Sequence, residues 1–180
     1  MENPASGNSS ANRGPPAAAA EGCGEFDIRI ARDGTWFYQG SPIQRLPLVK
    51  LFASVLRREG GDYLLVTPVE RGRIVVEDVP FIAVAMDAAG QGRTQTLSFT
   101  TNLDEIVPAG SEHPLRVETA EDGEPSPYIL VRPGLEARLA RPVFYELVDL
   151  AAEEELGGES QFGVWSGGMF FCLGDPGEEE

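Results

Sequence analysis

The chain has 180 residues, 42% of them hydrophobic, which is enough to bury the core of one domain or of two small domains sharing a core. Its formal net charge is −15, and residues 25–174 alone carry 23 acids against 13 bases, a net of −10. Such a surface repels a phosphate backbone, so we do not expect the protein to bind nucleic acid. No apolar run reaches the roughly 18 residues of a membrane span.

The first segment, residues 1–24, is rich in glycine, proline, serine, asparagine and alanine and lacks aromatic and β-branched residues. It cannot bury enough surface to offset the entropy of ordering, so we expect a disordered tail. No basic stretch precedes an apolar stretch there, so we expect no signal peptide. The two cysteines, Cys23 and Cys172, are too few for a disulfide framework. This favours free thiols and a cytoplasmic location; a disulfide between the two cysteines is the alternative.

Residues 25–90 are predicted to form a first α+β unit. Asp33-Gly34 is typical of a hairpin turn. Pro47 is suited to the first turn of a helix, which we predict over residues 47–58 with Leu51 and Phe52 buried on its apolar face. Alternating runs, or runs rich in β-branched and aromatic residues, predict strands at residues 26–30, 35–38, 63–66, 73–76 and 81–86.

Residues 91–174 are predicted to form a second, strand-rich α+β unit. Its helix is expected over residues 142–155, with Phe144 and Leu147 buried. An acidic tail, residues 175–180, follows the unit as a solubilising end. The same patterns predict strands at residues 94–100, 115–118, 128–131, 135–139, 161–165 and 169–173.

The two halves share one order of elements: strand, glycine turn, short strand, proline-started helix, Gly-Gly, strand, strand. Arg45 and Arg141 are 96 positions apart, and Gly-Gly pairs follow both helices at residues 60–61 and 157–158. We therefore expect an α+β fold of two repeated ββαββ-like units, with mainly antiparallel sheet and one principal helix each. The alternative is two similar units without an internal duplication, since few residues are identical.

Motifs for catalysis and cofactor binding are missing from the sequence. His113 is the single histidine, and one histidine without a cysteine pair does not supply the ligands of a zinc site. The chain has no Gly-x-Ser-x-Gly nucleophile motif, no dinucleotide-binding glycine motif and no phosphate-binding loop. We therefore expect no cofactor, no metal and no catalytic residue.

Two polar segments are candidates for a binding site, and we expect them to meet in space. Residues 67–81 contain three acids and two arginines, and residues 131–142 contain three arginines just before a helix start. Arginine forms forked contacts with carboxylate or phosphate, and helix starts attract anions. The alternative is that these residues neutralise one another as structural ion pairs. The candidate ligand-binding residues are Arg45, Glu70, Glu77, Arg132 and Arg141.

A series of sequence blocks runs through most of the chain. The blocks are WFYQGSPI at residues 36–43, LVKLF at 48–52, YLLVTPVE at 63–70, IVVEDVPF at 74–81, HPL at 113–115 and VRPGLEA at 131–137, followed by Arg141. In this order they resemble the bacterial family catalogued as domain of unknown function 1285. The resemblance implies an α+β fold with repeated motifs and suggests a role in signal transduction. It offers no catalytic residues.

Three functions are compatible with these observations. The leading hypothesis is a non-catalytic cytoplasmic module that binds a small anionic ligand or a signalling protein. The second is an enzyme that uses the carboxylates of Glu70, Glu77 and Asp78, with or without a metal. The third is a protein-interaction scaffold that presents aromatic residues 36–38.

Overall fold

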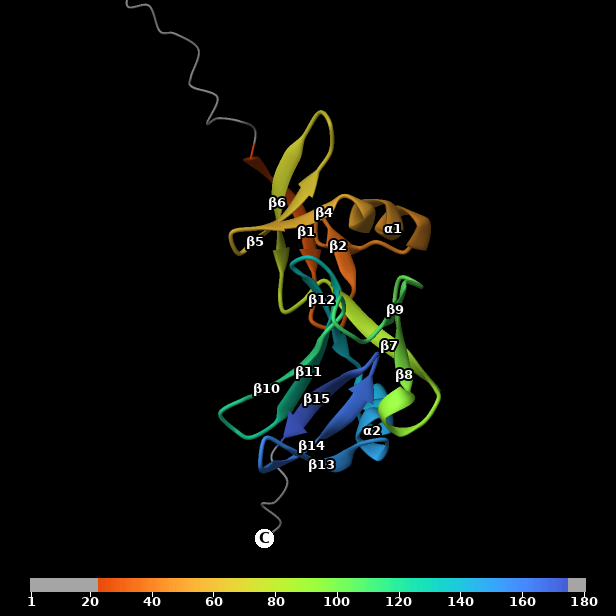
Figure 1. Ribbon diagram of the computed structural model, residues 1–180. Helices are drawn as coiled ribbons and strands as arrows, with labels where there is room; N and C mark the ends of the chain where they lie inside the picture. Colours follow the sequence, from red (N-terminus) through yellow and green to blue (C-terminus); the bar gives the residue numbers. More distant parts are fainter. Residues whose placement is uncertain (1–22, 175–180) are drawn as a thin grey trace, which may run out of the picture.

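The computed structural model describes residues 23–174. The predicted tail of residues 1–24 therefore lies outside the described residues except for positions 23 and 24, which open the first strand, and the acidic tail 175–180 lies outside them entirely. Two mixed six-stranded sheets, one three-stranded sheet and two α-helices make up the described part, which confirms the expected α+β class. The first sheet and α1 occupy one end of the molecule, and the other sheets and α2 occupy the other end (Figure 1).

The first sheet has the strand order β3-β2-β1-β6-β5-β4, and only the β1–β6 pair is parallel. The Asp33-Gly34 hairpin is confirmed, because Ile30 of β1 lies opposite Trp36 of β2. Gly34 is required there for two reasons: its φ is +89°, and a Cβ would lie 2.8 Å from the Ile82 side chain of the second sheet. The elements are β1 (Cys23–Ile30), β2 (Trp36–Tyr38), β3 (Ser41–Pro42), α1 (Leu46–Ser54), β4 (Leu56–Glu59), β5 (Asp62–Val66) and β6 (Arg71–Val76).

Helix α1 is shorter than the predicted helix over residues 47–58, and it buries a different face. Val49 and Ala53, which are four residues apart, are buried, whereas Leu51 is 61% exposed. The prediction that Leu51 is buried is therefore wrong. The helix ends early because the next residues form β4, whose backbone groups bond to β5 instead of continuing the helix.

The second sheet has the order β10-β11-β12-β7-β8-β9, with a parallel pair between β12 and β7. Residues 81–86, which the sequence analysis assigned to the first unit, belong to β7 and pair with β8 and β12 in this sheet. The strands predicted over residues 81–86 and 94–100 are confirmed as parts of β7 and β8, which pair with each other antiparallel. The strands are β7 (Phe81–Ala89), β8 (Thr96–Thr101), β9 (Ile106–Pro108), β10 (Leu115–Thr119), β11 (Pro125–Arg132) and β12 (Leu135–Leu139), with a short 3-10 turn, η2 (Gly92–Thr94), before β8.

The chain continues through α2 (Arg141–Asp149) into the antiparallel sheet β13 (Ala152–Leu156), β14 (Glu159–Ser166) and β15 (Met169–Gly174). The strands predicted over residues 161–165 and 169–173 are thus confirmed as β14 and β15, but the predicted helix over 142–155 is too long by its last turn and a half. The reason is the same as at α1: the residues after the helix pair with β14 as a strand. Leu147 is fully buried as predicted, whereas Phe52 and Phe144, also predicted to be buried, are only half-buried against the core.

The two halves repeat the order hairpin, helix, antiparallel strands, but they close differently. After α1, strand β6 returns to pair with β1; after α2, strand β15 stays in its own three-stranded sheet. The buried helix residues match at a separation of 94, since Val49 corresponds to Val143 and Ala53 to Leu147. The separation of 96 taken from Arg45 and Arg141 therefore does not align the buried faces.

Two further observations concern the described residues. None of the helices within residues 23–174 is both long enough and apolar enough to cross a membrane. Cys172 is an exposed, free thiol.

Candidate functional site

The two polar segments meet in space, as the sequence predicts. Phe81 at the end of the first segment lies opposite Ala137 of the second, where β7 and β12 run parallel. The Arg138 guanidinium lies 3.3 Å from the Asp78 carboxylate, and both side chains are largely buried. The meeting point thus joins Asp78, a carboxylate of the enzyme hypothesis, to Arg138, which was not among the candidate residues.

The five candidate residues are dispersed over this region. Arg45 precedes α1 and is exposed, and Glu70 is exposed in the β5–β6 turn. Glu77 accepts hydrogen bonds from the Arg29 side chain and from the Arg32 backbone N–H, both at 2.7 Å. Within residues 23–174, no hydrogen bond or ion pair connects one of the five candidates to another.

Arg132 links the two ends of the molecule. Its Nη2 donates to the carbonyl oxygen of Ala53 at the end of α1 at 2.9 Å, and its guanidinium carbon lies 5.6 Å from the centre of the Phe81 ring. Its Nε is buried without a partner among the described residues. A second contact between the two ends joins Lys50 of α1 to Asp104 at 2.8 Å. These contacts give Arg132 a structural role at the junction.

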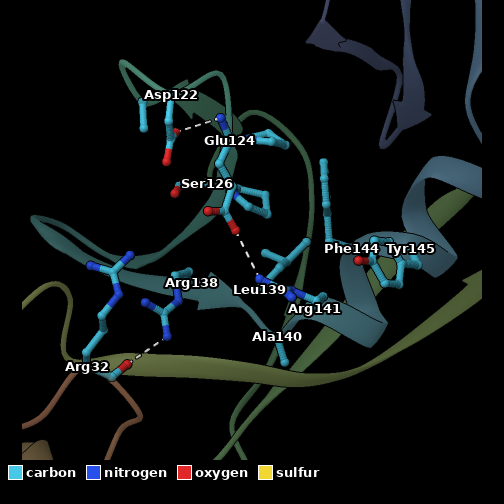
Figure 2. Close-up of a pocket in the computed structure, with 13 residues that line it drawn as sticks. Arg32, Asp122, Glu124, Ser126, Arg138, Leu139, Ala140, Arg141, Phe144 and Tyr145 are labelled. Atoms are coloured by element: carbon cyan, nitrogen blue, oxygen red, sulfur yellow. Dashed lines mark hydrogen bonds and ion pairs between the residues drawn. The ribbon is translucent and has the colours of Figure 1, made fainter.

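Arg141 alone among the five lines a cavity of about 680 Å³ (Figure 2). Two further arginines, Arg32 and Arg138, line it as well. In Figure 2, Arg32 and Arg138 lie toward one side of the cavity, and Arg141 lies beside α2 with its dashed contact to Glu124. The complete lining consists of Arg32, Ala120, Asp122, Glu124, Pro125, Ser126, Pro127, Arg138, Leu139, Ala140, Arg141, Phe144 and Tyr145.

The three arginines come from different elements and are held to different degrees. Arg138, on β12, is fixed by Asp78 and by the Arg32 carbonyl oxygen, to which its Nη2 donates at 2.7 Å. Arg141, the first residue of α2, contacts Glu124 at 3.0 Å, with both side chains mostly exposed. Arg32, in the β1–β2 turn, forms no ion pair with any acid of the described part of the chain. Within residues 23–174, the cavity therefore holds one guanidinium without an ion-pair partner and one that is weakly paired.

The electrostatic character of the cavity differs from that of the whole chain. Three arginines and two acids line it, a formal charge of +1, in a chain whose net charge is −15. The start of α2 also lies in the wall, and none of the described side chains caps it. Free N–H groups at a helix start add positive potential. The arrangement can bind an anion, with the Phe144 and Tyr145 side chains available to an apolar part of the ligand.

Beside the cavity, Tyr128 is almost fully buried and donates its hydroxyl to Asp78 at 3.0 Å. Burial, followed by the proximity of the Asp78 carboxylate, raises the pKa of the Tyr128 hydroxyl above its ordinary value. Burial also raises the pKa of Tyr63. Both tyrosines are therefore held neutral in the folded protein.

We expect this burial to make the protein sensitive to alkali. An unfolded tyrosine ionises near pH 10, whereas folded Tyr128 keeps its proton to higher pH, so the unfolded state loses protons first. The free energy of unfolding should fall as the pH rises above about 10, whereas below that pH the ionisation of Tyr128 should contribute nothing to its pH dependence. Urea unfolding between pH 8 and 11 measures this, with Tyr128→Phe expected to fall less steeply. An equal slope in Tyr128→Phe would contradict the assignment.

The residues proposed for the alternative functions are placed as follows. Glu77 and Asp78 contact different partners, Arg29 and Arg138 respectively. Among the described residues, no group of three histidine, cysteine or acidic side chains is positioned to hold a metal ion. His113 is half-buried, with its Nδ1 2.8 Å from the carbonyl oxygen of Leu130.

The aromatic run at residues 36–38 does not form one exposed patch. Trp36 is 2% exposed, and Phe37 is half-buried beneath the Arg29 guanidinium, 4.2 Å from its ring centre. Tyr38 alone of the three is exposed.

Comparison with known proteins identifies the family. No protein with a curated description matches the chain significantly. A crystal structure of a DUF1285 family protein from Silicibacter pomeroyi DSS-3 is 48% identical, with a TM-score of 0.78 over 89% of this chain and 88% of that chain. A second, of a DUF1285 family protein from Shewanella baltica OS155, is 28% identical, with a TM-score of 0.54 over 68% of this chain and 91% of that chain.

Two family models cover almost all of the described residues. Residues 17–79 match the DUF1285 N-terminal domain, a domain of unknown function, and residues 80–173 match the DUF1285 C-terminal domain. The division falls between β6 and β7, where the chain passes from the first sheet to the second. The family resemblance noted in the sequence is thus confirmed, and the chain belongs to the DUF1285 family.

Proposed function

We propose that the protein is a non-catalytic, cytoplasmic module that binds a small anionic ligand, carrying a carboxylate or phosphate group, in the cavity of Arg32, Arg138 and Arg141. The observation that carries the proposal is that three arginines from different elements line one cavity in a strongly acidic chain. Guanidinium groups bind planar or tetrahedral oxyanions through charge-assisted hydrogen bonds. A ligand of metabolite size fits a cavity of about 680 Å³.

The origin of the arginines supports a role in signalling. Arg32 belongs to the first sheet's hairpin, whereas Arg138 and Arg141 belong to the second sheet and the helix that follows it. An anion that contacts Arg32 and Arg141 together would connect the two halves of the chain. Its binding free energy would then depend on their relative position, which is the requirement for a ligand to shift a conformational equilibrium.

A thermal-shift screen tests the proposal. A ligand that binds only the folded state stabilises it by about 2.7 kcal/mol at a concentration of one hundred times Kd. For a protein of this size we expect an increase in Tm of roughly 5–10 °C at that concentration. The screen compares inorganic phosphate, succinate and citrate with sodium chloride at equal ionic strength. If no oxyanion raises Tm above the chloride control, the proposed function is wrong.

A further inference from the structure

The carboxylate of Glu124 already forms an ion pair with Arg141, one of the three arginines that line the cavity. Glu124 Oε1 accepts a hydrogen bond from Arg141 Nη2 at 3.0 Å (Figure 2). The contact is single rather than forked, and side-chain exposures of 70% for Arg141 and 60% for Glu124 leave it open to solvent. Arg141 therefore keeps further N–H donors that Glu124 does not use.

The backbone places Glu124 at the cavity independently of its side chain. Glu124 ends the β10–β11 turn, where its carbonyl oxygen accepts from Ala120 N and its N–H donates to Asp122 Oδ1. Gly123, with a φ of +83°, closes the turn, and its N–H donates to the Ala120 carbonyl oxygen. Pro125 follows directly and restricts the backbone of Glu124 to extended conformations. The Glu124 side chain can therefore leave Arg141 while its backbone stays in the cavity wall.

We infer that Glu124 is a resident carboxylate that the ligand's oxyanion group displaces from Arg141, and that it thereby limits the affinity of the cavity for anions. The inference rests on the proposed function. The contact with Glu124 shows that the Arg141 guanidinium can bind a carboxylate that lies on the cavity side. When the ligand binds, its oxyanion takes over the Arg141 N–H groups and the Glu124 carboxylate turns to solvent.

The strength of the resident contact makes this exchange reversible. Exposed ion pairs contribute little to stability because solvent screens them. Displacing Glu124 therefore weakens ligand binding by only about 1.5- to fivefold. A buried pair such as Arg138–Asp78, with exposures of 20% and 17%, is a poor candidate for the same exchange.

Isothermal titration calorimetry with citrate and with inorganic phosphate tests the inference. The variant is Glu124→Gln, which keeps the side-chain size and removes the charge. The matched control is Glu121→Gln, in the same turn but outside the cavity lining, which removes the same net charge. Equal values of Tm in the absence of ligand check that all three proteins are folded.

We expect Glu124→Gln to bind the anion about 1.5- to fivefold more tightly than the wild type and Glu121→Gln to bind it unchanged. Binding by Glu124→Gln alone, with none by the wild type, also supports the inference. If the wild type binds and Glu124→Gln binds no more tightly, or if both variants gain equally, the inference is wrong while the proposed function stands. If none of the three proteins binds either anion, the proposed function and the inference both fail.

Discussion

Leu147→Ala should lower the free energy of unfolding by about 2–5 kcal/mol, because it leaves a cavity at a fully buried site. Leu147 lies on the face of α2 that packs toward β7 and β14, so the substitution affects the contact between two sheets. The control is Leu51→Ala on α1, the same substitution at a side chain that is 61% exposed. It should change stability by no more than about 0.5 kcal/mol.

Urea denaturation of the two variants and the wild type gives these free energies directly. If Leu147→Ala costs less than about 1 kcal/mol, the buried face of α2 is misassigned. If Leu51→Ala costs as much as Leu147→Ala, the apolar face predicted from the sequence is the correct one and the α1 packing described here is wrong.

Gly163→Ala should lower the free energy of unfolding by about 3 kcal/mol or more. This is the upper end of the range that overpacking commonly costs. A Cβ at position 163 would lie 2.0 Å from the backbone oxygen of Phe171 on the adjacent strand. Backbone cannot move aside without breaking the β14–β15 pairing, which places residue 163 opposite Cys172. The clash can therefore be relieved only by disrupting the pairing of β14 with β15.

Gly174→Ala is the matched control, because Gly174 ends β15 in the same sheet and a Cβ there meets none of the described residues within 4 Å. Its effect should stay within about 0.5 kcal/mol. Both variants are compared by thermal unfolding followed by circular dichroism. Equal Tm values for Gly163→Ala and the wild type would contradict the close approach of β14 and β15.

The sequence predicts most strands correctly and the helix ends poorly, and the reason lies in the residues after each helix. Strand β8 alternates buried and half-buried residues, a pattern of period two that is visible without a structure. Strands β4 and β13, with the sequences LRRE and AEEEL, are charged and largely exposed. Such segments have no apolar periodicity, so the predicted helices extended into them.

The candidate site was predictable only in part. Buried Leu135, Ala137 and Leu139 alternate with half-buried Glu136 and Arg138, so the period of β12 indicates that the Arg138 side chain points away from the core. Nothing in the local sequence of Arg32 indicates that its turn reaches β12, more than 100 positions later. Arg132 was predicted to bind the ligand because of its charge. Instead, its guanidinium donates a hydrogen bond to the Ala53 carbonyl oxygen at the junction of the two halves.

Calorimetric titration of citrate into Arg141→Ala tests the proposal that the arginine-lined cavity binds an anion. Charge-assisted hydrogen bonds contribute about 1.5–3 kcal/mol, so the loss of Arg141 should weaken binding roughly 10- to 100-fold. Its exposed ion pair contributes little to folding, so Tm without ligand should stay close to that of the wild type. Arg45→Ala, which removes an exposed arginine outside the cavity, should bind citrate like the wild type. Undiminished binding by Arg141→Ala, or an equal loss in Arg45→Ala, would show that the cavity is not the anion-binding site.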